Sequence, residues 1–464
     1  MTNLPSRFQG IEIPSENPFQ NDKLGFSQHA STLTGMVDIY KDCGCVISVN
    51  GKWGSGKTTF LQMWRASLPS DKYETIFFNA WETDFYTEPL IAILGELREI
   101  SGESEQEKKL VSAAGKIALA TGSALVKGLV KKYTGVDKEI IDETTDAIKS
   151  SFERSLDSYK SQKQSLSEFK DRLSEFVASQ DKKTVVFIID ELDRCNPNYA
   201  VKVLETVKHL FDVPNICFIL AIDKSQLECS IKGYYGSNEI DADNYLRRFI
   251  DIEFRMPAPN LEGFTNILFN HYKYKEVFDW LRTRTQDPGG DFCEMATALG
   301  MLYSTDLRTY DKIFAHTRLA LGQLNNDAVL VDVVLFLCFL RVADDSFYTA
   351  IAKHKFSVQG LLDELEKRFP KQFLVQESYG SSAGRLAHSI VYMIGPLLIL
   401  YNVIDGVTQE NGINDLDESK ELSLRCNFID KETLKSSILW FSHYGSRSYG
   451  LSSVLKTVNL LRHF

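Results

Sequence analysis

An apolar run that leads through a glycine-rich loop into a helical pattern is the feature that most restricts how this 464-residue chain can fold. Residues Cys45–Val49 read as a short buried strand, and Thr59–Ser67 read as the start of an amphipathic helix. The stretch between them, GKWGSGKT at 51–58, has the spacing of glycine, four residues, glycine, lysine and threonine. Strand, loop and helix in this order predict a site that holds phosphate.

Each residue type in this loop has a separate expected role. Gly51, Gly54 and Gly56 lack a Cβ, so we expect positive φ angles that bring backbone N–H groups close to phosphate oxygens. Lys57 would reach the β and γ phosphates, and the Thr58 hydroxyl would ligate Mg²⁺. A turn that merely joins a strand to a helix is the alternative. The residues expected to line the phosphate site are Gly51, Trp53, Gly54, Ser55, Gly56, Lys57, Thr58 and Thr59.

A second apolar run, TVVFIIDELDRC at 184–195, ends in acidic residues. Such a run is typical of a strand that is buried on both faces of a parallel sheet. Asp190 would hold Mg²⁺ at the exit of this strand, through water or the Thr58 hydroxyl. Glu191 would accept a proton from the attacking water or orient it, and Asp193 is the other candidate for this catalytic carboxylate. A buried strand with a solvated acidic turn is the alternative.

The remaining strand candidates alternate with helical patterns. They are YETIFFNAW at 73–81, ICFILAID at 216–223 and DIEFRM at 251–256. This alternation predicts an α/β fold in which helices cover both faces of a parallel sheet. Beyond Pro257 the pattern is almost entirely helical. The predicted domains are an α/β core at 1–258 with a polar helical insertion at about 101–165, a helical lid at 259–330 and a C-terminal helical domain at 331–464.

Composition limits the classes of partner and compartment. The net charge of −10 and the pI of about 5.5 argue against broad nonspecific binding to nucleic acid and leave room only for a local basic patch. The N-terminal stretch has no apolar signal core. The eight cysteines are scattered, and those in apolar segments resemble reduced core residues. We therefore predict a cytoplasmic protein.

Membrane spans are not predicted. The longest apolar run, 389–404, is shorter than the ~20 residues that a bilayer requires and contains Gly395 and Pro396. The stretch at 110–130 is rich in small residues but is interrupted by Lys116 and Lys127. This stretch could instead dock on a partner or a surface, although we do not expect peripheral membrane contact.

Five short motifs together resemble the KAP family of P-loop NTPases over about residues 17–320. They are WGSGK at 53–57, FFNAW at 77–81, IIDELDRC at 188–195, FILAID at 218–223 and NYLRRF at 244–249. The resemblance implies an ASCE-type ATPase core, in which a catalytic acid follows the magnesium-binding aspartate. Many bacterial relatives are associated with mobile elements or with defence against phage. Many also carry transmembrane helices where this chain has its polar insertion, so their membrane association is not carried over.

Five further positions follow from matching this family. Asp223 would sense the γ phosphate, and Arg247 or Arg248 would project into the site of a neighbouring subunit. Arg308 and Lys312 resemble the arginine motif of the helical lid. For each of these positions, a solvated or salt-bridged surface charge is the alternative.

The sequence supports two classes of function. The first is an ATP-hydrolysing switch or motor in a homo-oligomer that drives a separate partner or effector protein. The second is a nucleotide-gated scaffold with slow hydrolysis that recruits such an effector. No guanine-reading Asn-Lys-x-Asp or Thr-Lys-x-Asp motif occurs, which favours adenine, so the expected cofactors are ATP and Mg²⁺. The sequence shows no Ser/His/Asp, Cys/His or zinc-binding cluster that would form a second catalytic site. An effector nuclease or deaminase would therefore have to be a separate chain.

Overall fold

The computed structural model describes residues 8–85, 89–101, 105–120, 149–179, 183–208, 213–280, 287–323, 331–369, 382–404, 407–408, 413, 416–444 and 451–459. Its contacts divide the chain into two compact units. The sheet unit comprises Ile11–Asp22 and Phe26–Ala258, and the helical unit comprises Met1–Gly10, Lys23–Gly25 and Pro259–Phe464. The finer division into core, lid and C-terminal domain stays a prediction.

The sheet unit is built on five parallel strands. They are β1 (Cys45–Asn50), β2 (Tyr73–Asn79), β3 (Thr184–Asp190), β4 (Ile216–Ile222) and β5 (Ile252–Arg255). Their order across the sheet is β2-β3-β4-β1-β5. All residues of β3 and β4 are buried, as their unbroken apolar composition requires of strands covered on both faces. The predicted fold class is confirmed.

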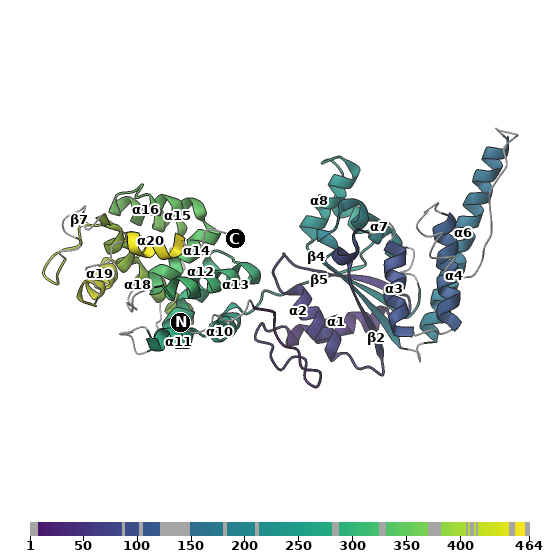
Figure 1. Cartoon of the computed structure of the whole chain (residues 1–464), viewed down its shortest axis with the longest axis horizontal. Coiled ribbons are helices and arrows are strands. Elements are labelled where there is room, and N and C mark those ends of the chain that lie inside the picture. The colour runs from purple at the N-terminus through teal and green to yellow at the C-terminus, as the bar shows by residue number, and fades with distance from the viewer. Residues whose placement is uncertain are drawn as a thin grey trace. The chain divides into compact units, whose positions relative to one another are not determined.

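Helices cover both faces of this sheet (Figure 1). Helices α1 (Ser27–Tyr40) and α2 (Lys57–Ser67) lie on one face. Helices α3 (Pro89–Ser101), α7 (Pro197–Lys208) and α8 (Lys224–Tyr235) pack against the other. Short connections complete the unit: η1 (Ala80–Thr83), η2 (Leu192–Arg194) and α9 (Ala242–Leu246).

The two faces have separate apolar layers because neighbouring residues of a strand point in opposite directions. Phe187 of β3 belongs to the layer shared with α3 and α7. On the other face, the ring of Phe60 in α2 stacks on Phe254 of β5, with the centroids 5.8 Å apart. The indole of Trp64 donates a hydrogen bond to the Thr34 hydroxyl of α1 at 2.9 Å. These layers hold α2, and with it the loop that precedes α2, against the sheet.

The insertion between β2 and β3 contains α4 (Glu105–Ala120) and α6 (Lys149–Ala178), which pack against each other. Most of the candidate docking stretch at 110–130 lies outside the described residues. The α6 side chains Phe169, Leu173 and Phe176 are buried in the same apolar layer as α3 and α7. The part of the insertion that the structure describes is therefore anchored to the sheet unit.

The helical unit contains α10 (Leu261–His271), α11 (Tyr274–Trp280), α12 (Pro288–Leu302), α13 (Leu307–Leu321), α14 (Val331–Ala343), α15 (Asp345–Ala352), α16 (Val358–Arg368), α18 (Ser382–Tyr401), α19 (Lys431–Tyr444) and α20 (Leu451–Asn459). Side-chain caps define several starts: Asp306, for example, accepts hydrogen bonds from the backbone N–H groups of Arg308 and Thr309 at the start of α13. The short antiparallel pair β6 (Val403–Ile404) and β7 (Val407–Thr408) departs from the predicted all-helical region.

The longest apolar stretches of this unit are buried against protein. Helix α14 is buried along most of its length, and α18 is buried from Ile390 to Leu400 except for Tyr392. Within the described ranges, none of the helices combines the length and the apolar character that a bilayer crossing would require.

Close packing of α18 on α19 makes Gly395 a sensitive position. A Cβ there would lie 2.6 Å from the Ser437 carbonyl carbon and 2.7 Å from the Ile438 nitrogen. We expect Gly395→Ala to destabilise the helical unit by about 1–3 kcal/mol, because one of the two helices must move. Thermal unfolding followed by circular dichroism would measure this.

Gly35 of α1 is the matched control, since no described atom lies within 4 Å of its would-be Cβ. Gly35→Ala should raise stability by about 0.5–1 kcal/mol, through helix propensity alone. Equal melting temperatures for the two variants would contradict the packing argument.

Candidate nucleotide-binding site

The loop between β1 and α2 curls as expected, although its three glycines are needed for different reasons. Gly54 and Gly56 have φ angles of 74° and 90°, in the left-handed region. The expectation of a positive φ at Gly51 is wrong. A Cβ at Gly51 would instead lie 2.8 Å from both the Met256 Cβ and the Ser55 Oγ. Space, and not backbone conformation, therefore requires glycine at this position.

The loop and the first turn of α2 present groups that suit an anion. Thr58 and Thr59 lie in the first turn of α2, whose N-terminal N–H groups and dipole favour negative charge. The Ser55 hydroxyl is buried and finds no hydrogen-bond partner among the described residues. A phosphate oxygen could accept that hydrogen bond. The residues present therefore fit a phosphate-bearing ligand.

Lys57 is folded back into this loop. Its side chain is buried, and its ammonium donates to the carbonyl oxygens of Gly51 at 2.6 Å and Lys52 at 3.3 Å. To reach a phosphate, the ammonium must exchange these carbonyls for phosphate oxygens, which are stronger acceptors. The loop carbonyls thus hold the Lys57 ammonium next to the place where phosphate would bind.

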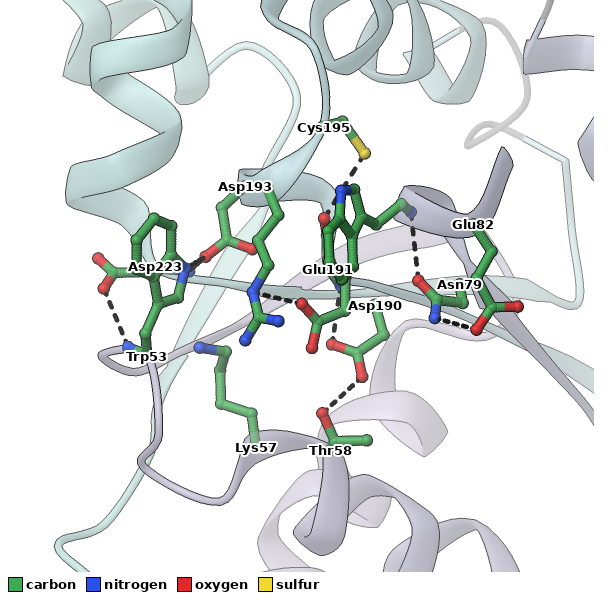
Figure 2. A network of polar contacts seen from close by, with 12 residues as sticks. Trp53, Lys57, Thr58, Asn79, Glu82, Asp190, Glu191, Asp193, Cys195 and Asp223 are labelled. Atoms are coloured by element: carbon green, nitrogen blue, oxygen red, sulfur yellow. Dashed lines mark hydrogen bonds and ion pairs between the residues drawn. The ribbon is translucent and has the colours of Figure 1, made fainter. Parts of the chain in front are cut away.

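Four carboxylates surround the Lys57 ammonium (Figure 2). Burial lowers the pKa of Lys57 from its ordinary value, while the charges of Asp193, Asp223, Asp190 and Glu191 oppose that shift. All four acids lie at the carboxyl ends of β3 and β4 or in the turns that follow. The acidic strand and the phosphate loop therefore converge at one edge of the sheet.

Thr58 in α2 and Asp190 at the end of β3 meet directly, although β4 lies between β3 and the strand β1 that precedes α2. The Thr58 hydroxyl donates to Asp190 Oδ2 at 2.7 Å, and the backbone N–H of Glu191 donates to Asp190 Oδ1 at 2.9 Å. Burial raises the pKa of Asp190, and these two hydrogen bonds oppose the rise. A hydroxyl and a carboxylate are oxygen ligands of the kind that Mg²⁺ prefers.

The donor set is too small to be a metal cage of protein groups alone. Among the described residues, no group of three or more His, Cys, Asp or Glu side chains could hold a metal ion. Mg²⁺ is characteristically held by one or two carboxylates together with phosphates and water. The pair Thr58 and Asp190 fits that pattern.

Glu191 leaves the strand in a left-handed conformation, with a φ of 61°. Its Oε2 lies 2.5 Å from the Nε of Arg194 in η2. The Arg194 guanidinium lies over two indole rings, 5.9 Å from the centroid of Trp53 and 5.7 Å from that of Trp81. The candidate catalytic carboxylate is thus held by an arginine that contacts the phosphate loop.

Asp193 and Asp223 link the acidic turn to the loop and to α8. Asp193 Oδ2 accepts hydrogen bonds from the Trp53 indole at 2.6 Å and from the Asp223 backbone N–H at 2.7 Å. Asp223 in turn accepts from the Trp53 backbone N–H at 3.2 Å and from the Ser225 hydroxyl at 2.6 Å. Asp223 thus contacts the loop directly, where a polar residue could respond to phosphate.

The candidate arginine and lysine side chains are exposed to solvent. Arg247 is 73% exposed and pairs with Asp243 at 2.7 Å, and Arg248 is also exposed. Arg308 and Lys312 are exposed on α13 in the helical unit.

The sequence predicts no role for three motif residues that the structure places near the acidic turn. They are Asn79, Trp81 and Arg194. Asn79 pairs in register with Asp190 across β2 and β3, and its Oδ1 accepts a hydrogen bond from the Trp81 backbone N–H at 3.2 Å. Asn79 is a polar residue at the end of a largely apolar strand, which is the signal that identified Asp190.

Comparison with known proteins supports the motif assignments. The sequence model of the KAP family P-loop domain matches residues 26–319. The phage T7 exclusion protein of Escherichia coli (strain K12) is 23% identical over 363 residues, which cover 73% of this chain and 47% of that protein. The chain therefore spans about half the length of this curated relative.

A solved structure of the Aeropyrum pernix ORC2 protein in ADPNP and ADP complexes aligns over 85% of this chain and 88% of that one. The TM-score is 0.33 and the identity is 12%. The family match, in contrast, runs from α1 through the phosphate loop and the acidic strand into α13, over more than half of the chain. The chain therefore belongs to the KAP family of P-loop NTPases.

Proposed function

We propose that this protein binds ATP with Mg²⁺ and hydrolyses it, as a switch or motor within a larger assembly. The observation that supports this most is the 2.7 Å contact between Thr58 and Asp190, with Glu191 and the Lys57 ammonium beside it. These groups supply what phosphoryl transfer needs: oxygen ligands for a metal, a cation for the phosphates and a base for water.

Each side chain has a distinct task in this proposal. Lys57 neutralises charge on the β and γ phosphates, and the loop N–H groups hold their oxygens. Thr58 and Asp190 would hold Mg²⁺, which supplies charge neutralisation when bound. Glu191 orients the attacking water and accepts its proton. Asp223 responds to the γ phosphate through the Trp53 backbone N–H that it now holds.

The biological setting is part of the proposal. A relative named for phage exclusion suggests a role in defence against phage. We propose that the active form is a homo-oligomer and that a separate effector protein carries any further chemistry. The scaffold alternative differs in one respect: ATP binding alone would suffice for its output.

The phosphate loop is tested by Lys57→Ala. We expect this variant to lose measurable binding of Mg·ATP in calorimetric titration, because the loop amides alone would face the phosphate charge. Lys52→Ala is the matched control, since that side chain is exposed on the same loop and only its carbonyl contacts Lys57. Wild-type affinity in the Lys57→Ala protein would contradict the assignment of this loop as a phosphate-binding loop.

Binding and chemistry are separated by Glu191→Gln. The variant should bind ATP normally and lose most turnover, since an amide cannot accept the proton of the water. Asp193→Asn is the comparison that decides between the two acids. If Asp193→Asn is inactive while Glu191→Gln turns over normally, the base has been assigned to the wrong carboxylate. If the Glu191→Gln protein keeps its function in cells although it no longer hydrolyses ATP, the scaffold alternative is favoured.

The trans-acting arginine gives a prediction about assembly. An arginine supplied from outside a site can accelerate phosphoryl transfer by ~10³- to 10⁵-fold. The pair between Arg247 and Asp243 is largely exposed, so Arg247 can leave it at small cost. We expect ATPase activity per chain to rise with protein concentration, and Arg247→Ala or Arg248→Ala to bind ATP but turn over far more slowly.

Mixing either arginine variant with the Lys57→Ala protein, which keeps its arginines, should restore part of the activity. Arg255→Ala is the control, because Arg255 is also an exposed arginine and pairs with Glu253. An activity per chain that is constant on dilution, with monomers throughout by light scattering, would leave both arginines as surface charges.

A further inference from the structure

The Arg194 guanidinium lies over indole rings from two other elements of the sheet unit. Trp53 comes from the phosphate loop, Trp81 comes from η1 after β2, and Arg194 itself lies in η2 after β3. A planar guanidinium stacks on aromatic faces while its N–H groups remain available at the edge. Here the Arg194 Nε forms an ion pair with Glu191 Oε2 at 2.5 Å. The acidic turn thus contacts two other elements through this one side chain.

This ion pair differs from an ordinary surface pair. The side chains of Arg194 and Glu191 are only 20% and 17% exposed. The pair between Arg172 and Glu175 on α6 has the same three-residue spacing, but its side chains are 35% and 54% exposed and stack on no described aromatic ring. Water screens an exposed pair and leaves it little influence on conformation. The enclosed pair can therefore fix where the Glu191 carboxylate points.

Trp53 makes this orientation depend on the phosphate loop. Its indole is tied to Asp193, and its backbone N–H is tied to Asp223. The Arg194 guanidinium lies over the same ring, 5.9 Å from its centroid. Any shift of the loop that frees the Trp53 N–H for phosphate must also move the surface on which Arg194 rests.

We propose that Arg194, which lies over the Trp53 and Trp81 rings, is a positioning residue that aims Glu191 at the attacking water when the phosphate loop is occupied. The inference rests on the proposed function, because it assigns Arg194 a part in hydrolysis through Glu191. Arg194 is not itself a catalytic residue, since it contacts Glu191 and the two indoles and would act only through Glu191.

The first test replaces the arginine. Arg194→Ala should lower kcat about 100-fold, the loss typical of a misplaced catalytic group, and leave the Kd for Mg·ATP unchanged. Arg194→Lys should retain intermediate activity, because it keeps the charge but not the planar stacking edge. Arg172→Ala should match the wild type in both measurements.

The second test changes Trp81, one of the two indoles near the guanidinium, and leaves the arginine in place. Trp81→Phe keeps an aromatic face for the guanidinium and should retain most of the wild-type kcat. Trp81→Ala removes that face and should lower kcat severalfold without changing the Kd. A purely structural role for Trp81 would lower the melting temperature of both variants and leave kcat of the folded protein unaltered.

A measurement that needs no turnover separates this inference from the proposed function. Mg·ADP with fluoroaluminate mimics the transferring phosphoryl group and its water. Arg194→Ala should bind this complex more weakly than the wild type and bind Mg·ADP equally well. Equal affinity for the mimic, or wild-type kcat in Arg194→Ala, would overturn the positioning role. If the wild type binds the mimic more tightly than Arg194→Ala does but hydrolyses no ATP, the proposed function is refuted and the positioning role is not.

Discussion

Negative charge concentrated around one buried ammonium is the constraint on which the site depends. Asp190, Asp193 and Asp223 are each less than a tenth exposed, and Glu191 lies beside them. Lys57 alone cannot balance four acids, and buried charge without partners is strongly unfavourable. A nucleotide would bring further negative charge. The site therefore requires additional cations, which Arg194 supplies within the chain and Mg²⁺ would supply with the ligand.

Each buried acid requires hydrogen-bond donors. These donors come from neighbouring elements, so the hydrogen bonds tie those elements together. The Thr58 hydroxyl joins α2 to the end of β3 through Asp190. Trp53 joins the loop to Asp193 in η2 and to Asp223 at the start of α8. Strand β4 lies between β1 and β3, so Asp223 stands where it can contact both the loop and the acidic turn. The phosphate loop, the turn and α8 thus form one connected edge.

The sheet could be predicted because buried parallel strands are recognisable from composition, and the loop could be predicted because strand, glycines and helix are contiguous. Contacts between distant segments could not. Trp53 and Asp193 are 140 positions apart, and their hydrogen bond depends on strand order. Gly51 shows a subtler limit: its glycine was expected, but the neighbour that excludes a Cβ, Met256, lies at the far end of the sheet unit's sequence. The contacts of Arg194 with Trp53 and Trp81 could not be predicted for the same reason.

The backbone of Glu191 shows how the acidic strand delivers two carboxylates to one place. Successive residues of a strand point to opposite faces, so a continued β3 would direct Asp190 and the next side chain apart. At Glu191 the chain instead takes a left-handed conformation, which costs roughly 1–2 kcal/mol for a residue with a Cβ. The Glu191 N–H then donates to Asp190, and its carboxylate meets Arg194. Local strain of this kind persists where surrounding contacts impose it, and here those contacts are the ones that hold the candidate base near the phosphate loop.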